Sequence, residues 1–480
     1  MGQTGRWFQT IGTKARISRL SFISLVILAL GALAAGASER KPDDLGGGRM
    51  KSMRVDGSFD PESNFLDATA QLQFTQPADD RRLWLAEGLQ LTSVRSGAAP
   101  VLGVQRNSNQ FLVPGPSYEE LELRYSGRLL PVPDPLEASW GAERAGAVKP
   151  LDDCRFLSYI ADFYPHPQTD FAAMKIDLRL PEGWNCLGSG TLNSVSSTPG
   201  GNRFSFDNVE TKGMSLVCGR FRQIDYIAGA MPVRLHAWAG FRFKRYFSKP
   251  DLQRLLSFYI GRFGAPGFTE LNILFRRGHN FGGVSYNGLL VLGVDEAWGR
   301  IMAKDRKKIE AESPLGMIDA GNDLLAHELA HQWWGGLISW KTAADNWITE
   351  GLSTYSMLLY ARERRGEKAW QKLRRHLRKW VERYADKGAS ADGIRLKLQQ
   401  GDLRAYQALV YVKPALMLAE LADRIGEDEL CRRLRRFLSE RCHSSVGSKD
   451  FLDMLSNGDG ALRACLEEWI HGRGLPSPTS

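Results

Sequence analysis

Two histidines and a glutamate stand at a spacing that can hold and use a metal ion. In "GNDLLAHELAHQWWGGLISW" (residues 321–340), His327 and His331 are four positions apart, and Glu328 follows the first. Side chains at positions i and i+4 lie one above the other on a helix, so both imidazoles can bind one ion. Glu328 can then reach a water on that ion and act as its general base in a hydrolysis. The pattern H-E-x-x-H is short and also arises by chance on buried helices, so a third ligand has to support it.

Glu350 is the candidate third ligand. It lies 19 positions after His331, in "ADNWITEGLSTYSMLLYAR", where a helical period restarts near Asp345. Its neighbours on this second helix leave little polar face: Trp347, Ile348, Leu352, Tyr355, Leu358 and Leu359. A solvated surface glutamate is the alternative, but a buried carboxylate without a partner is costly. Two histidines and a carboxylate are a catalytic zinc set, and we expect one Zn²⁺ per chain.

The segment "HELAHQWWGGLISWKTAADNWITEGLSTY" resembles the zinc-binding segment of the aminopeptidase N family. These gluzincin peptidases, which include the leukotriene hydrolases, carry H-E-x-x-H-x-W followed by a glutamate in a W-x-x-E-G context. The matching positions are His327, Glu328, His331, Trp333, Trp347, Glu350 and Gly351. The resemblance implies a zinc metallopeptidase with ligands His327, His331 and Glu350, and with Glu328 as the base.

The family also carries a tyrosine, in a Y-x-K-G-A context, that hydrogen-bonds the oxyanion of the tetrahedral intermediate. Here the similar stretch is "YVKPAL", so the resemblance points to Tyr411, which is 61 positions after Glu350. Pro414 stands where the family has glycine. Tyr406 is a weaker alternative, and a core tyrosine without a catalytic role is the other interpretation.

The substrate end departs from the family. Its exopeptidases have a G-x-M-E-N segment whose glutamate holds the free amino terminus, whereas "GGVSYNGLL" has Ser285 at that place and keeps Gly282, Gly283 and Gly288. Gly282, Gly283 and Ser285 are therefore the candidate substrate-binding residues. A serine lacks the charge that strengthens a bond to an ammonium, although an edge strand can still bind a peptide backbone. We favour aminopeptidase action; the alternatives are a peptidase without free-amine specificity and a non-catalytic peptide-binding homologue.

The chain divides into four parts by pattern. Residues 1–37 read as a signal peptide or an uncleaved N-terminal anchor, because a basic stretch precedes an apolar run that ends in Ala35-Gly36-Ala37. Residues 38–52 read as a polar linker. Short alternating segments over 53–235 predict a β-sandwich. Residues 236–475 turn increasingly helical, and the resemblance implies a thermolysin-like zinc peptidase domain there. The expected fold class is thus multi-domain, β followed by α/β.

The composition and net charge of the chain limit the classes of partner that it is expected to bind. The first 37 residues supply four of the nine net positive charges, so the remainder carries only +5 and we expect no nucleic-acid partner. A peptide or protein is the expected substrate, and the chain is expected to be exported, with membrane attachment possible through residues 20–37. The basic stretches "RRHLRKWVERY" and "CRRLRRFLSER" read as solvated helix faces or, less favoured, a lipid-binding surface. Six cysteines leave both disulfides and buried thiols open; the oligomeric state is also open.

Overall fold

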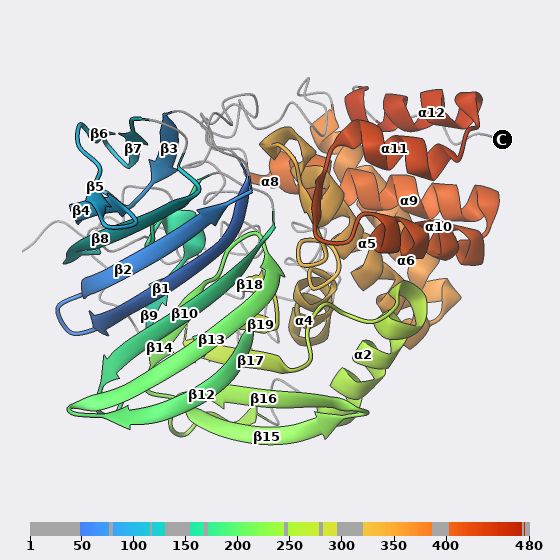
Figure 1. The fold of residues 1–480 in the computed structure, drawn as a ribbon. Coiled ribbons are helices and arrows are strands. Elements are labelled where there is room, and N and C mark those ends of the chain that lie inside the picture. The colour runs from blue at the N-terminus through green and yellow to red at the C-terminus, as the bar shows by residue number, and fades with distance from the viewer. Residues whose placement is uncertain are drawn as a thin grey trace, which may run out of the picture.

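The computed structural model describes residues 49–75, 80–115, 118–129, 154–167, 171–243, 248–277, 282–294, 320–385, 403–472 and 475. The predicted targeting segment, 1–37, lies outside these residues. Within them, no helix has the length and apolar character needed to cross a membrane. The chain runs from a β-rich N-terminal part to a helical C-terminal part, with a second sheet between the two (Figure 1).

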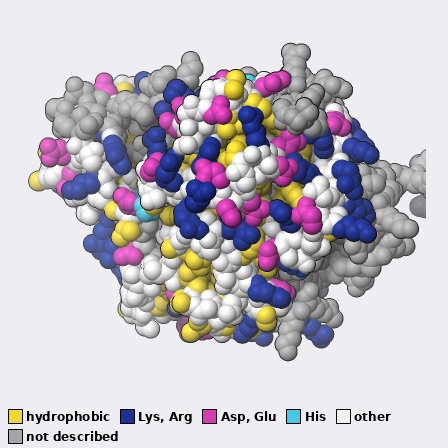
Figure 2. Space-filling model, turned by 90° about the vertical axis from the view of Figure 1, so that its right-hand side faces the viewer, with side chains coloured by type: hydrophobic (Ala, Val, Ile, Leu, Met, Phe, Trp, Pro, Cys, Tyr) yellow, Lys and Arg dark blue, Asp and Glu magenta, His cyan; other side chains and the backbone are white. Residues whose placement is uncertain are grey.

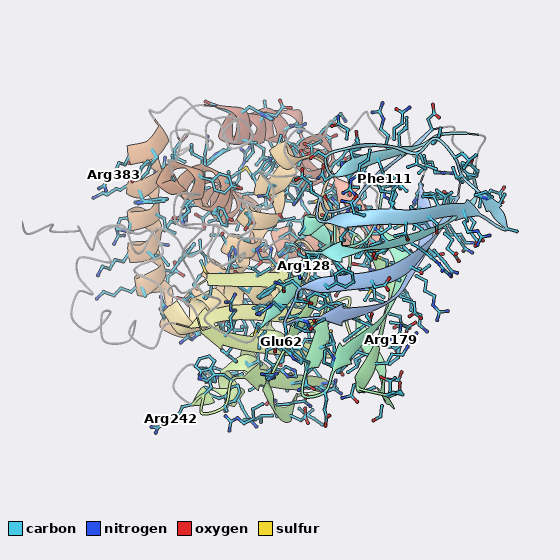
Figure 3. The ribbon with its side chains drawn as sticks, turned by 90° about the vertical axis from the view of Figure 1, so that its left-hand side faces the viewer. Glu62, Phe111, Arg128, Arg179, Arg242 and Arg383 are labelled. Carbon is cyan, nitrogen blue, oxygen red and sulfur yellow. The ribbon has the colours of Figure 1, made fainter. Side chains whose placement is uncertain are left out.

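An eight-stranded sheet dominates the N-terminal part. Its order is β12-β13-β10-β1-β2-β8-β4-β5. The strands are β1 (Met50–Asp60), β2 (Phe65–Phe74), β4 (Leu89–Ser96), β5 (Ala99–Pro100), β8 (Glu120–Arg128), β10 (Ala172–Pro181), β12 (Thr191–Thr198) and β13 (Gly201–Thr211). Every pair is antiparallel except β1 with β10, which is parallel. Arg128 and Arg179 lie exposed on β8 and β10 (Figure 3).

Two three-stranded sheets complete the N-terminal domain. One has the order β3-β7-β6 and the other β11-β14-β9. Their strands are β3 (Arg81–Trp84), β6 (Gln105–Asn107), β7 (Gln110–Val113), β9 (Arg155–Leu157), β11 (Asn185–Gly188) and β14 (Leu216–Gly219), and a short 3-10 turn, η4, covers Tyr159–Ala161. All three sheets contribute to one apolar core. Layered sheets around a shared core confirm the predicted β-rich N-terminal domain.

The cysteines are free thiols in the structure. Cys186 and Cys218 are direct cross-strand neighbours on β11 and β14, with their Sγ atoms 3.8 Å apart. Both are buried, and burial raises the pKa of the Cys186 thiol. Buried thiols with a raised pKa react slowly.

The second sheet has five strands in the order β15-β16-β17-β19-β18. They are β15 (Arg222–Ala228), β16 (Met231–Ala237), β17 (Leu271–Arg277), β18 (Gly282–Tyr286) and β19 (Leu289–Val294). The predicted boundary at residue 235 falls inside β16, and β15 already pairs with β16 along its length. The five-stranded sheet thus begins at Arg222, before the predicted boundary. Strand β1 begins at Met50, which lies inside the predicted linker. Its residues Met50 and Met53 are buried in the core.

Strand β18 is the edge of this sheet and is covered on its two faces by different partners. Val284 and Tyr286 pack with Leu187 and Val217 of the N-terminal domain. Gly283 and Ser285 face the other way, toward the helix that begins at Ala320. Side chains alternate between the two faces of a strand. One face of β18 therefore contacts the N-terminal domain, and the other faces the site described below.

Helices form the remainder of the described chain. They are α2 (Lys249–Phe263), α4 (Ala320–Ala330), α5 (Asn346–Arg365), α6 (Glu367–Ala385), α8 (Leu403–Tyr406), the π-helix η7 (Gln407–Val412), α9 (Lys413–Ile425), α10 (Glu427–Glu440), α11 (Ser448–Ser456) and α12 (Gly460–His471). A 3-10 turn, η6 (Ala343–Asp345), precedes α5, and β20 (Ile338–Trp340) pairs with β21 (Ser444–Val446). The mostly helical C-terminal part confirms that prediction.

The two basic stretches lie on α6 and α10. Helix α6 buries Leu373, Leu377 and Trp380 and exposes charged residues on its opposite face. On α10, Arg432 and Arg433 pair with Glu429. The helical side of the molecule shows Lys and Arg side chains interspersed with Asp and Glu (Figure 2). Mixed charge of this kind agrees with solvated helix faces.

Candidate metal centre

Helix α4, the turn after it and helix α5 bring the three predicted metal ligands together. His327 lies near the end of α4, His331 follows in the turn after it, and Glu350 lies in the second turn of α5. The two histidine Nε2 atoms are 3.1 Å apart. Glu350 Oε2 is 3.4 Å from Nε2 of His327 and 3.3 Å from Nε2 of His331. All three side chains are buried and therefore have little contact with solvent.

The donor set fits a zinc ion. Each residue offers one ligand atom, and the three atoms lie within 4.8 Å of one another. Glu350 Oε2 is buried yet has no hydrogen-bond donor in good geometry among the described residues. A buried acceptor in that state is costly unless a cation satisfies it. Two imidazoles and one carboxylate are the ligands that catalytic zinc takes, with a position left for water.

His331 is oriented by two contacts on its other nitrogen. Its Nδ1 lies 2.9 Å from the Trp334 carbonyl oxygen and 3.0 Å from Ser353 Oγ. These acceptors place a proton on Nδ1 and leave Nε2 facing the ligand cluster. Sequence reasoning missed Ser353, although it lies one helical turn after Glu350 on α5 and hence on the same face.

The charges of the cluster support one another. Burial raises the pKa of Glu350, but the neighbouring imidazoles lower it by more, so the carboxyl is held well below its usual range. Burial lowers the pKa of His331, and the Glu350 carboxylate more than offsets this and raises it. For His327 burial prevails and lowers the pKa. The Glu350 carboxylate therefore interacts directly with the imidazoles. A divalent ion bound at this site would replace that interaction.

Glu328 lies between the cluster and the edge strand. A Cβ atom on Gly283 would come within 2.3 Å of Glu328 Cγ, so only glycine leaves room for this side chain. Burial raises the pKa of Glu328 to about 7. Its Oε2 is buried with no hydrogen-bond partner among the described residues. A glutamate with a pKa near neutrality beside a metal site suits a general base.

Tyr411 is carried by the π-helix η7, which packs against α5. Single π-helical turns inside helical segments frequently mark functional sites. The Tyr411 ring stacks on the His327 ring with centroids 5.9 Å apart, and its hydroxyl interacts with Glu350. Burial, reinforced by the Glu350 carboxylate, raises the pKa of Tyr411 well above its usual value, so the phenol keeps its proton. The structure thus places Tyr411 at the cluster, while the Tyr406 hydroxyl accepts a hydrogen bond from Asn346.

Pro414, which stands where the family has glycine, lies against Gly351, the residue after Glu350. A Cβ on Gly351 would lie 2.5 Å from the Pro414 Cβ. The proline ring therefore fills the space above Gly351 where α5 crosses the start of α9. This close approach holds η7, and with it Tyr411, against the helix that carries Glu350.

Of the predicted substrate-binding residues, Gly283 and Ser285 face α4, and Gly282 begins the same strand. Ser285 is bonded by Gln332, a residue that sequence reasoning missed. Gln332 follows His331 directly and stands four positions after Glu328, which was the available signal. The catalytic, ligand and substrate-binding roles given to these residues stay predictions, although the structure gathers them in one place.

The structure has two domains and brings together His327, His331 and Glu350 as a candidate metal site. Residues 291–469 match the peptidase family M1 domain. Aminopeptidase N of Streptomyces lividans is 21% identical over 358 residues, covering 68% of this chain and 39% of that protein. Mitochondrial aminopeptidase 2 of Saccharomyces cerevisiae is 22% identical over 257 residues, covering 51% and 25%. The chain therefore spans less than half the length of these relatives.

Solved structures show the same fold over most of the chain. An M1 zinc metallopeptidase variant from Deinococcus radiodurans, bound to a Tyr-Ser-Ala substrate, superposes with a TM-score of 0.69 at 18% identity, covering 90% of this chain and 96% of that one. A two-domain M1 zinc metallopeptidase variant bound to L-tryptophan gives a TM-score of 0.70 at 17% identity. The match to the peptidase family M1 domain over residues 291–469 agrees with the predicted resemblance to the aminopeptidase N family.

Proposed function

We propose that this protein hydrolyses peptide bonds with one zinc ion held by His327, His331 and Glu350. The observation that carries the proposal is the convergence of these three buried ligand atoms beside a buried glutamate whose pKa is raised to about 7. The relatives named as aminopeptidases and the M1 zinc metallopeptidases of the same fold support peptides as the substrate class.

A zinc ion in this donor set supplies Lewis acidity and a water of lowered pKa. Glu328 takes a proton from the attacking water and delivers it to the leaving amine, for which a pKa near neutrality is suited. The Tyr411 phenol, which stays protonated, donates a hydrogen bond to the oxyanion that develops at the scissile carbonyl. Ser353 and the Trp334 carbonyl keep the His331 ring in place during these steps.

The substrate backbone has an edge to bind to. Strand β18 ends the five-stranded sheet, and one of its faces lies against Glu328. A peptide that adds to this edge as a further strand brings its carbonyl groups to the level of Glu328.

Metal removal and return test the proposal. The purified protein should contain one zinc per chain, cleave members of a mixed peptide library, lose this cleavage on dialysis against a chelator and regain it with Zn²⁺. The products, read by mass spectrometry, give the bonds cleaved. A zinc-loaded protein that cleaves no peptide but retains peptides on a column would replace hydrolysis with peptide binding; a protein without zinc would remove the proposal altogether.

We also infer export, because the first 37 residues have the pattern of a signal peptide or anchor. Fusing residues 1–40 to a reporter enzyme that is active only outside the cytoplasm tests this inference. A silent reporter would contradict export. Comparing the N-terminus of the mature protein, and its release from membranes by alkaline carbonate, separates a cleaved signal from a retained anchor.

A further inference from the structure

The edge strand and α4 make a second contact one helical turn beyond Glu328. Gly283 and Ser285 lie on the same face of β18, and Glu328 and Gln332 lie on the facing side of α4 and the turn after it. Gly283 meets Glu328, and Ser285 meets Gln332, with Gln332 Nε2 2.7 Å from Ser285 Oγ. We call Ser285 and Gln332 the neutral pair.

The hydrogen bonds fix the orientation of the Gln332 amide. Its Oε1 accepts from the backbone N–H of Gly288 at 2.8 Å, and a backbone N–H can only donate. The Nε2 must therefore face β18, where it donates to Ser285 Oγ and, at 2.9 Å, to the Tyr286 carbonyl oxygen. Both protons of this nitrogen are then used. Since Ser285 Oγ accepts here, its own hydroxyl proton is left to donate.

The neutral pair consequently offers a substrate an uncharged donor. Gln332 is buried, with 1% of its surface exposed, whereas Ser285 is only half-buried and can be reached. The hydrogen bonds of this pair in the described chain go to a backbone N–H, a backbone carbonyl and each other, and none goes to a carboxylate. Within the part of the chain that the structure describes, the carboxylates at the candidate metal site are those of Glu328, the proposed base, and Glu350, a proposed metal ligand.

An ammonium and an amide make opposite demands on such a pair. An ammonium carries three donors and a charge, so it needs acceptors and, when shielded from water, an opposite charge. An amide carbonyl is a neutral acceptor and matches the Ser285 hydroxyl. Hydrogen bonds to charged groups are stronger than those between neutral groups, so a neutral pair gives a free amine no advantage.

The position of the pair decides which part of the substrate it meets. Antiparallel addition, the more stable kind of strand pairing, directs the N-terminal side of the substrate from Gly283 toward Tyr286. Ser285 lies two residues along β18 from Gly283, about 7 Å at the usual strand rise. It therefore lies on the N-terminal side of a carbonyl held at Glu328.

We propose that the site takes peptides in which the residue before the scissile bond carries an amide on its nitrogen instead of a free amine. That amide comes either from a preceding residue, in the interior of a longer peptide, or from a blocking acyl group. The proposal rests on the proposed hydrolysis and gives its substrate class, for which it replaces the aminopeptidase action favoured from the sequence with the alternative of a peptidase without free-amine specificity. It assigns Ser285 and Gln332 a role in specificity, through the hydroxyl proton that their contact leaves free.

Three forms of one peptide test the proposal, using whichever sequence the wild-type enzyme cleaves in the library. One form begins with a free amine at the residue before the scissile bond, one is acetylated there, and one continues for four further residues. We expect kcat/KM for the acetylated or the extended form to equal or exceed that for the free amine. A tenfold or greater preference for the free amine would overturn the proposal. The ratio of acetylated to extended form identifies the source of the amide, and no cleavage of any form would count against hydrolysis itself.

Two variants locate the effect at the neutral pair. Ser285→Glu adds a carboxylate there and should shift the ratio of free-amine to acetylated kcat/KM by at least tenfold toward the free amine. Ser285→Ala removes the hydroxyl donor without adding a charge, so it should lower kcat/KM for the acetylated form more than for the free amine. Zinc content and melting temperature report whether each variant folds. A folded, zinc-loaded Ser285→Glu variant with an unchanged ratio would show that Ser285 does not face the substrate's N-terminal side.

Discussion

The two contacts between α4 and β18 differ in the charge they present. At the first, Gly283 makes room for a buried glutamate beside three ligand atoms. At the second, one turn later, Ser285 and Gln332 satisfy each other without a charge. In our proposals the charged contact carries out the hydrolysis, whereas the neutral contact determines whether the residue before the scissile bond has a free amine or an amide on its nitrogen. Chemistry and specificity are thus carried by separate residues, and substitutions should affect them separately.

The largest expected effect is at the charged end. Glu350→Ala removes one of three ligands, so zinc should be lost and kcat/KM should fall by roughly 10³-fold or more, since the base then has no activated water. Glu363→Ala is the matched control, because Glu363 is exposed on the same helix. Elemental analysis beside a peptide assay measures both. Full zinc occupancy in a folded Glu350→Ala variant would show that Glu350 is not a ligand.

Tyr411→Phe should lower kcat by about 10²–10³-fold, the usual effect of losing one oxyanion donor. KM and zinc content should change little, because the ring that stacks on His327 remains. Tyr406→Phe removes only the hydrogen bond with Asn346 and serves as the comparison. A larger loss in Tyr406→Phe than in Tyr411→Phe would reverse the roles of the two tyrosines.

The charged end was largely predictable from the sequence, and the neutral end was not. His327, Glu328, His331 and Glu350 stand at spacings that helix geometry turns into contacts, so the pattern carries the site. Ser285 was recognised only as a departure, because its meaning depends on the bond to Gln332 across 47 positions of the chain. Pairing between distant segments leaves little periodic signal.

The same limit applies to the fold. The alternating strands and later helices predicted the order of domains, and they put the boundary near residue 235, inside β16, because β15 and β16 have the same alternating pattern as the first domain. Only pairing of β16 with β17 shows that they belong to the second sheet. The π-helix at Tyr411 was likewise indistinguishable from an ordinary helix in sequence.

Gly283→Ala tests the contact that separates the two ends. The added Cβ would lie 2.3 Å from Glu328 Cγ, so the base has to move. A displacement of about 1 Å at a reacting group costs on the order of 10²-fold in rate, and we expect that loss in kcat with zinc retained. Gly261→Ala, on α2, is the control, since a Cβ there meets nothing within 4 Å. A Gly283→Ala variant as active as the control would show that the contact between Gly283 and Glu328 does not position the base.

A polar contact inside the sheet should affect stability and leave turnover unchanged. His236 is buried and bonds Asn272 at 3.0 Å; burial, with help from Arg234 and against the effect of Asp225, lowers its pKa to about 4, and the Phe221 ring lies at its edge. The unfolded chain binds a proton near pH 6.5 and the folded chain only near pH 4. Stability is therefore present above pH 6.5 and falls as the pH drops toward 4, by roughly 3 kcal/mol.

Urea unfolding at several pH values measures this loss. In His236→Gln the same part of the pH dependence should disappear, while kcat/KM at neutral pH should stay within about twofold. An unchanged pH profile in that variant would show that another group is responsible.

The most direct test of the account is Glu328→Gln, because glutamine keeps the shape of the side chain and removes its ability to take a proton. We expect a folded protein with the same zinc content as the wild type and a kcat/KM lower by about 10²–10⁴-fold, measured on the same peptide. Full turnover by a zinc-loaded Glu328→Gln variant would contradict the central claim that this glutamate activates the water.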